Sequence, residues 1–86
     1  MNLTKQPQYQ HSILIVDDEV SILNAFKRIL AEEDYDVHVA SNGPEGLAML
    51  RATDKPYSLI ISDQRMPEMN GVQFFVQAKR ICPDAV

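Results

Sequence analysis

Residues 13–19 read ILIVDDE, four apolar side chains followed at once by three carboxylates. A short apolar run that ends in charge is typical of a buried β-strand that stops where the chain reaches water. The same pattern returns at residues 59–63, which read LIISD. We therefore predict that Ile13–Val16 and Leu59–Ser62 are strands, and that they lie side by side in one parallel sheet.

Three aspartates follow these two runs, namely Asp17, Asp18 and Asp63. If the strands are parallel neighbours, their carboxyl ends lie at the same edge of the sheet and the three side chains converge there. Like charges at short range repel unless a cation lies among them, and an all-oxygen set of ligands suits a hard divalent ion. The sequence therefore predicts a site for Mg²⁺.

Helical and extended patterns alternate along the rest of the chain. Between about residues 20 and 31, apolar residues recur at helical spacing, and we expect Ile22, Leu23, Phe26, Ile29 and Leu30 to form the buried face. Val37–Ala40 is predicted as a strand, and a helix is predicted to begin at Pro44 and end near Ala52. Another helix is predicted from Val72 to Ile81. Its buried face is expected to consist of Val72, Phe75 and Val76, with Phe74, Ala78 and Ile81 adding to it. The β-α-β-α-β-α order predicts an α/β fold with right-handed crossovers.

Composition bounds the class of protein. The chain has 86 residues, 45% of them apolar and 23% charged, which is ordinary for one small globular domain. The net charge of −4, without a basic stripe, gives no reason to expect direct binding of nucleic acid or of a membrane surface. The single cysteine, Cys82, fits a reducing compartment, and no apolar stretch nears the roughly 20 residues that cross a bilayer. We expect a cytoplasmic protein with a flexible tail over residues 1–11.

The apolar run at residues 59–61 conflicts with the length of the chain. A strand that is apolar at every position belongs inside a sheet, and in the flavodoxin-like order 2-1-3-4-5 the third strand needs a fourth beside it. The sequence stops at Val86, before any fourth strand. The third strand would then be an exposed edge that pairs readily with another chain. Three readings follow: a fragment of a longer protein, an exchange of elements with a second copy, or association through this edge.

The two acidic ends, together with residues 63–71, which read DQRMPEMNG, resemble the receiver domain of two-component response regulators. The match extends over residues 12–86, about the first two thirds of such a domain. It implies a flavodoxin-like parallel sheet of strand order 2-1-3, truncated after the third βα unit, without strands four and five. The residues Asn70-Gly71 themselves predict a turn, and the resemblance implies that Gly71 lets the chain turn into the last helix.

The resemblance implies specific roles for the residues at the acidic edge. Asp63 would be the phosphoacceptor, which takes a phosphoryl group from a histidine of a sensor histidine kinase. Asp18 would bind Mg²⁺ directly and Asp17 through water, with Asp63 and the backbone carbonyl of Arg65 as further ligands. Glu19 falls in the family pattern without being a direct ligand. The module would be a regulatory domain rather than an enzyme, with self-phosphorylation from small phosphodonors at most.

Two residues of the family pattern are missing from the sequence. Receivers carry a Thr or Ser after strand four and a Lys after strand five, both of which contact the phosphoryl group. Lys55 is no substitute, since it precedes the third strand and lies at the opposite end of the sheet. The resemblance therefore implies a chain that cannot switch alone. The alternative is a fragment that acts only as a dimerising or domain-swapped interaction module.

Other functions fit the residues less well. Phosphatases with an aspartate nucleophile need a second Asp two residues later, and residues 17–19 read DDE. No Gly-x-Gly-x-x-Gly follows the first strand, which argues against dinucleotide binding. His38, Cys82 and the loop residues Met66 and Met69 are interpreted as structural. Arg65 either controls the access of water to the phosphoryl group or is a solvated side chain.

Overall fold

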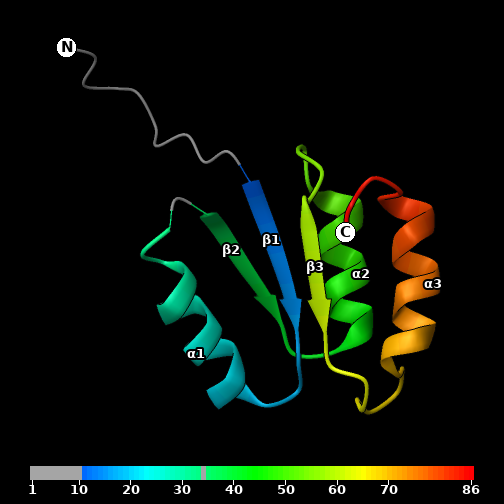
Figure 1. Ribbon diagram of the computed structural model, residues 1–86. Coiled ribbons are helices and arrows are strands. Elements are labelled where there is room, and N and C mark those ends of the chain that lie inside the picture. Colours follow the sequence, from blue (N-terminus) through cyan, green and yellow to red (C-terminus); the bar gives the residue numbers. More distant parts are fainter. Residues whose placement is uncertain (1–10, 34) are drawn as a thin grey trace.

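Three parallel strands form one sheet in the order β2-β1-β3, which confirms the order predicted from the sequence. The computed structural model describes residues 11–33 and 35–86 (Figure 1). The elements are β1 (His11–Val16), α1 (Val20–Leu30), β2 (Tyr35–Ala40), α2 (Gly43–Ala52), β3 (Leu59–Ser62) and α3 (Gly71–Ile81). The fold is therefore the flavodoxin-like α/β arrangement through its third βα unit.

Helices cover both faces of the sheet, with α1 on one side and α2 and α3 on the other (Figure 1). Side chains of a strand alternate between the faces, so β1 serves both layers. Leu14 and Val16 lie in the layer with Phe74 of α3, whereas Ile13 and Ile15 pack with Leu23 of α1. All four apolar side chains of residues 13–16 are therefore buried, two on each face of the sheet.

The first two strands are longer at their amino ends than the sequence predicts. His11 pairs with Tyr35 and Ser12 with Asp36, so the ladder between β1 and β2 begins before either apolar run. The predicted tail otherwise falls outside the described residues, whereas its last predicted residue, His11, belongs to β1. Backbone pairing extends these strands where side-chain pattern alone indicates no strand.

The buried faces of two helices differ from the predicted ones. In α1, Leu23 is buried, but Ile22 and Ile29 are 38% and 65% exposed. In α3 the core residues are Phe74 and Ala78, while the predicted face of Val72, Phe75 and Val76 is exposed. In α3 apolar residues lie around most of the helix, and in α1 the apolar stripe is wider than the face that meets the sheet, so spacing alone does not select the buried residues.

Asparagine side chains begin both helices that pack on the second face. Asn42 accepts a hydrogen bond from the Glu45 N–H at 2.8 Å at the start of α2, and Pro44 is the second residue of that helix rather than the first. Asn70 is the N-cap of α3 and forms a reciprocal capping box with Gln73. The predicted turn at Asn70-Gly71 is therefore wrong: the left-handed residue of this loop is Glu68, with φ of 70°.

Gly71 is required for space rather than for backbone conformation. It does not have positive φ. A Cβ atom at this position would lie 2.7 Å from the carbonyl oxygen of Asp63 and 2.7 Å from Oε1 of Gln64. Its N–H donates to the Gln64 carbonyl at 3.0 Å, which brings the start of α3 against the end of β3. The glycine thus lets α3 begin beside Asp63.

Gly71→Ala is expected to destabilise the fold by about 1–3 kcal/mol, because the added methyl group must displace backbone atoms. The free energy of urea unfolding measures this change. Gly43→Ala is the matched control, since its Cβ would meet side-chain atoms of Met69, Sδ at 2.8 Å and Cβ at 3.0 Å, and no backbone atom. A smaller effect at Gly71 than at Gly43 would contradict the steric explanation.

The outer edge of β3 is partly covered by the last residue of the chain. The Val86 N–H donates to the Ser58 carbonyl at 3.0 Å, and the Ile60 N–H donates to the Val86 carbonyl at 2.9 Å. The predicted exposed edge is therefore occupied at its beginning. Further along, towards Ser62, no other strand of the described chain lies against it.

His38 and Tyr57 form a polar contact at the edge of the core. Tyr57, in the segment between α2 and β3, is 3% exposed, and its ring stands edge-on to the His38 ring with centroids 5.4 Å apart. The Tyr57 hydroxyl and Nδ1 of His38 are hydrogen-bonded, and Nε2 of His38 lies 3.0 Å from a carboxylate oxygen of Asp36. Burial, and secondarily the charge of Asp36, raises the pKa of the Tyr57 phenol. The structural interpretation of His38 thus gains defined partners.

Stability is expected to fall at alkaline pH through Tyr57. Because its pKa is raised on folding, the folded chain keeps the phenol proton to a higher pH than the unfolded chain does. The contribution is complete below the ordinary tyrosine pKa of about 10 and is lost as pH rises through the folded-state value. Urea unfolding of wild type and Tyr57→Phe between pH 8 and 11 measures it: the wild type should lose its advantage over the variant as pH rises. A constant difference would contradict this.

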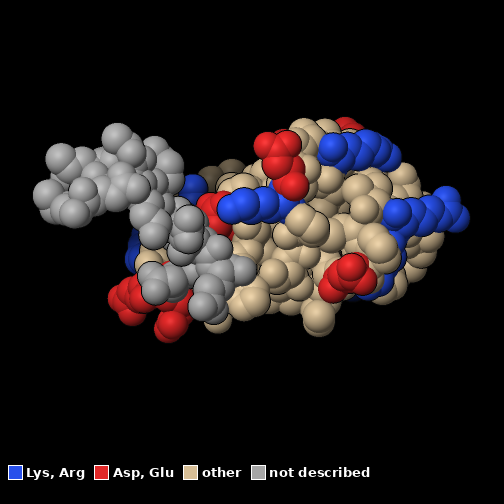
Figure 2. Space-filling view, turned by 90° about the horizontal axis from the view of Figure 1, so that it is seen from above, with Lys and Arg blue, Asp and Glu red and all other residues tan. Residues whose placement is uncertain are grey.

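Charges are scattered over the end of the molecule at which the strands begin. Figure 2 shows this end, and lysine, arginine, aspartate and glutamate side chains are interspersed on its described part. In residues 11–33 and 35–86, every helix is too short or too polar to cross a membrane.

A candidate metal centre

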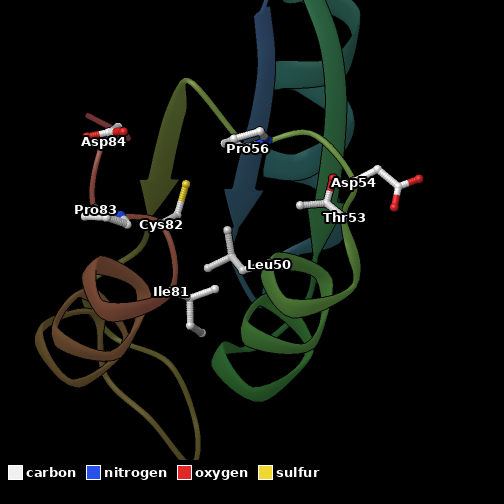
Figure 3. A pocket seen from close by; sticks show the side chains of 8 residues that line it. All are labelled: Leu50, Thr53, Asp54, Pro56, Ile81, Cys82, Pro83 and Asp84. Atoms are coloured by element: carbon white, nitrogen blue, oxygen red, sulfur yellow. The ribbon is translucent and has the colours of Figure 1, made fainter.

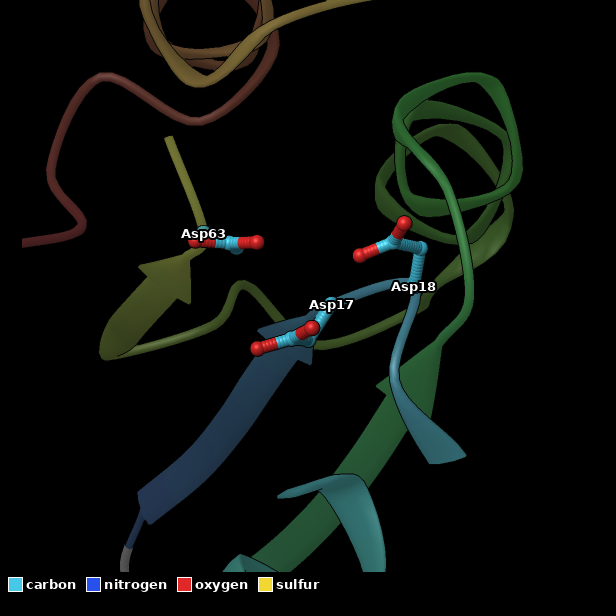
Figure 4. A group of neighbouring side chains, drawn as sticks. All are labelled: Asp17, Asp18 and Asp63. Carbon is cyan, nitrogen blue, oxygen red and sulfur yellow. The ribbon is translucent and has the colours of Figure 1, made fainter. Parts of the chain in front are cut away.

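Three carboxylates meet at the carboxyl edge of the sheet. Asp17 directly follows β1, Asp18 begins the connection to α1, and Asp63 directly follows β3. One carboxylate oxygen from each lies within 4.8 Å of the others. Figure 4 shows Asp18 and Asp63 pointing toward one another across the end of β1. The convergence predicted from the two apolar runs is present.

Backbone pairing places two of the aspartates. The Asp17 N–H donates to the Ala40 carbonyl at 3.0 Å, and the Asp63 N–H donates to the Val16 carbonyl at 2.9 Å, so both residues extend the ladders by one step. Asp17 also accepts a hydrogen bond from the Glu19 N–H at 2.9 Å. Glu19 is the N-cap of α1, so this bond orients the carboxylate without capping an amide inside the helix.

A neighbouring amide orients the Asp63 carboxylate. The Gln64 N–H donates to Oδ1 of Asp63 at 2.8 Å. Gln64 in turn contacts Gly71 through its carbonyl, which ties the loop to the start of α3. Nothing in the residue type of Gln64 indicates this role, because its contribution comes from the backbone.

The donor set fits a hard divalent cation. Asp17 and Asp63 are half-buried and Asp18 is exposed, so a partly hydrated ion can reach all three. Among residues 11–33 and 35–86, the close contact between a basic and an acidic side chain is that of His38 with Asp36, and the three carboxylates at this edge have no lysine, arginine or histidine partner. Uncompensated negative charge on oxygen ligands favours Mg²⁺ or a similar ion over softer metals.

The other residues named from the sequence lie around this group or away from it. Arg65 is exposed in the loop two residues past Asp63, and its carbonyl stays a predicted ligand. Met66 and Met69 pack against the core, which confirms their structural interpretation. Lys55 lies in the segment before β3 and is exposed at the opposite end of the sheet, as predicted.

A shallow pocket lies at that opposite end, between the ends of α2 and α3 (Figure 3). Its lining includes Leu50, Pro56, Ile81 and Cys82. These residues lie at the carboxyl ends of α2 and α3 or just before β3, at the end of the sheet where the strands begin, so the pocket is separate from the aspartates.

Comparison with known proteins identifies the family. The family model for the response regulator receiver domain matches residues 13–84. The chain belongs to this receiver family. The transcriptional regulatory protein GlrR of Escherichia coli K12 is 38% identical over 71 residues, which are 83% of this chain and 16% of that protein. The transcriptional regulatory protein SrrA of Staphylococcus aureus is 41% identical over 63 residues, 73% of this chain and 25% of its own.

Solved structures agree with the family. A structure described as adenylate cyclase from Rhodopirellula baltica superposes with a TM-score of 0.84 at 41% identity, covering 88% of this receiver and 55% of that chain. The chemotaxis protein CheY4 of Vibrio cholerae gives a TM-score of 0.75 at 33% identity, with 81% and 57% covered. The present receiver sequence thus spans a small part of its curated relatives and somewhat over half of these structures. Receiver domains are regulatory phosphoacceptor modules of two-component systems.

Proposed function

We propose that this chain is the phosphoacceptor part of a two-component response regulator, phosphorylated on Asp63 by a sensor histidine kinase in the cytoplasm. The observation that carries the proposal is the group of three carboxylates within 4.8 Å, which combines a candidate nucleophile with a candidate cation site. Membership of the receiver family supports it. Because the chain spans only part of the length of its relatives, the proposal concerns this module alone.

Asp63 is the proposed nucleophile. A carboxylate oxygen attacks the phosphorus of a phosphohistidine, the P–N bond breaks, and its electron pair returns to the imidazole nitrogen, which takes up a proton. The product is an acyl phosphate on Asp63. The Gln64 N–H, which donates to Oδ1, leaves the other carboxylate oxygen to attack. Turnover on a free substrate is not part of this role, so the module is not an enzyme.

Mg²⁺ is the proposed cofactor. Asp18 and Asp63 would bind it directly and Asp17 through water, with the Arg65 carbonyl as a further ligand. The bound ion would offset the charge on the oxygens of the transferring phosphoryl group. Asp17 and Asp18 directly follow β1, and a bound cation would offset the repulsion between their negative charges.

These 86 residues contain neither the Thr or Ser nor the Lys that the family places after its fourth and fifth strands. Removing one positioned contact to a developing charge typically costs about 10²–10³ in rate. We therefore propose that the 86-residue chain alone is slow in phosphotransfer and does not switch.

Phosphorylation by a small phosphodonor tests the main proposal. The chain is incubated with acetyl phosphate and Mg²⁺, and intact mass and peptide mapping follow the label. A single phosphoryl group on Asp63, formed only when the divalent ion is present, is the expected result. A label on another residue, or equal labelling after chelation of the metal, would overturn the assignment.

A second candidate function is an interaction module that pairs through the outer edge of β3. Only Val86 pairs with this edge within the described residues. Val72, Phe75 and Val76 are exposed on α3, and Phe75 lines a small hollow together with Ile60 of β3 and Val86. Such an edge is a template for a strand of another chain. We expect the chain to sediment as a dimer at high concentration, and a monomer at every concentration would exclude this function.

A further inference from the structure

The β3–α3 loop, residues 63–70, is shaped by hydrogen bonds of its own backbone. The Gly71 N–H donates to the Gln64 carbonyl at 3.0 Å, and the Met69 N–H donates to the Pro67 carbonyl at 2.7 Å. Figure 1 shows this loop and the start of α2 at the same end of the sheet. The two bonds fold the loop on itself without reaching α2, so its position against that helix depends on side chains.

The side chain of Met69 lies between the two helices on this face. At Gly43, the first residue of α2, a Cβ atom would lie 2.8 Å from Sδ of Met69, so the methionine occupies the space that a side chain would fill there. Nε2 of Gln77 in α3 donates to the same sulfur at 4.0 Å. Met69 is half-buried and packs against the cluster that contains Leu47 and Phe74. It therefore ties the loop to both α2 and α3.

The residue before Met69 has a strained backbone. Glu68 has φ of 70°, in the left-handed region that residues other than glycine rarely adopt. Such a conformation persists only where the surrounding structure holds it. The Glu68 side chain is exposed and adds no packing of its own. The strain is therefore offset by the two residues that follow, the packed Met69 and Asn70, whose side chain accepts a hydrogen bond from the Gln73 N–H at 2.9 Å.

We propose that Met69 is a positioning residue for phosphorylation, because its contact with Gly43 holds the β3–α3 loop in place beside Asp63. The inference rests on the phosphoacceptor function proposed above. The loop contains Gln64, whose N–H orients the Asp63 carboxylate, and Arg65, whose carbonyl is a proposed ligand of the ion. When the methionine contact is lost, the strained residue before it relaxes and the loop shifts. The amide and the carbonyl then leave the positions that the reaction needs.

Amide hydrogen exchange tests the position of the loop, because it reports local opening separately from global unfolding. The Gly71 amide, bonded to Gln64, reports the loop, and the Asp17 amide, bonded to Ala40, reports the sheet. In Met69→Ala, exchange at Gly71 should rise by about fivefold or more relative to Asp17. Met69→Leu, which has a similar volume, should exchange like the wild type. An equal change at both amides, no change, or the same opening in Met69→Leu would overturn the proposal.

A change on the α2 side of the contact gives an independent test. The Cβ atom of Gly43→Ala must displace the Met69 side chain, so this variant should also raise exchange at Gly71. In Met69→Ala that space is vacant, and adding Gly43→Ala should change little further. Met49→Ala is the matched control, because Met49 packs partly buried against the same cluster from α2 itself. Additive effects of the two changes, or equal opening by Met49→Ala, would overturn the role of the contact.

Labelling by acetyl phosphate with Mg²⁺ separates this inference from the function on which it rests. If the wild type is labelled on Asp63, Met69→Ala should be labelled about tenfold more slowly, because a small displacement of positioned groups is costly in rate. Met69→Leu should restore the wild-type rate. Unchanged labelling of Met69→Ala with an opened loop would overturn the link between Met69 and the reaction. A wild type that takes no label would overturn the phosphoacceptor function and that link together, while the exchange pattern still decides whether Met69 positions the loop.

Discussion

Asp63→Asn is expected to abolish covalent phosphorylation of the chain by acetyl phosphate, because an amide lacks the carboxylate oxygen that attacks phosphorus. The fold should survive. Asparagine has nearly the same shape, and its side-chain oxygen can still accept the hydrogen bond from the Gln64 N–H. Removing one of three clustered negative charges should leave the urea midpoint equal or raise it. Intact mass after incubation with Mg²⁺ and the phosphodonor measures the loss.

Asp54→Asn is the matched control for this experiment. Asp54 is exposed beyond the end of α2, at the opposite end of the sheet from the three carboxylates. The same change in charge at this position should leave labelling unaltered. Residual labelling of Asp63→Asn at the wild-type rate would mean that another residue takes the phosphoryl group. An equal loss in Asp54→Asn would mean that net charge, rather than the nucleophile, controls the reaction.

The parts of the fold that depend on local pattern were predictable. The bounds of β3 at Leu59–Ser62 agree with the predicted ones, since the strand ends where the apolar run meets the charge of Asp63. The meeting of Asp17, Asp18 and Asp63 follows from topology, because parallel neighbours end at the same edge. Neither inference needs knowledge of how side chains pack.

The parts that depend on packing were not predictable from spacing. In α3, Phe74 rather than Phe75 enters the core, and it does so where Gly46 of α2 leaves room: a Cβ at Gly46 would lie 3.0 Å from the Phe74 ring. The extent of β1 depends on pairing of His11 with Tyr35, a contact between residues distant in sequence. Tyr57 follows a Lys-Pro pair that indicates only a turn, and it is buried among residues of β1, α2 and α3 that are distant in sequence.

The candidate site shows the same division. The carboxylates stand at strand ends, where the apolar pattern marks them. Gly71 is also visible in the sequence, but its reason is not: a turn was predicted, whereas the structure needs space beside the Asp63 carbonyl. The left-handed residue is Glu68, which has no glycine or asparagine signal to mark it. Site residues were thus predictable where a charged side chain directly follows an apolar strand. They were not predictable where backbone contacts determine which residue is needed.

Asp18→Asn is expected to change stability in opposite directions with and without Mg²⁺. In the absence of the ion, the three carboxylates repel at less than 4.8 Å. At an effective dielectric between that of water and that of a protein surface, removing one charge should stabilise the fold by about 0.5–1 kcal/mol, since Asp18 is exposed and screened. Wild type gains about 1.4 kcal/mol when the ion is present at tenfold its dissociation constant.

The variant should lose most of that gain, because the loss of a charged ligand weakens binding by about tenfold to a hundredfold, at least as much as the loss of an outer-shell partner. The two unfolding curves should therefore change order as Mg²⁺ is added: the variant is more stable without the ion, and the wild type is more stable with it. Urea titrations with Mg²⁺ and with a chelator measure the crossing. Asp54→Asn again serves as control and should show neither effect. Parallel curves for wild type and Asp18→Asn would mean that no cation binds among the carboxylates, since repulsion alone cannot reverse the order.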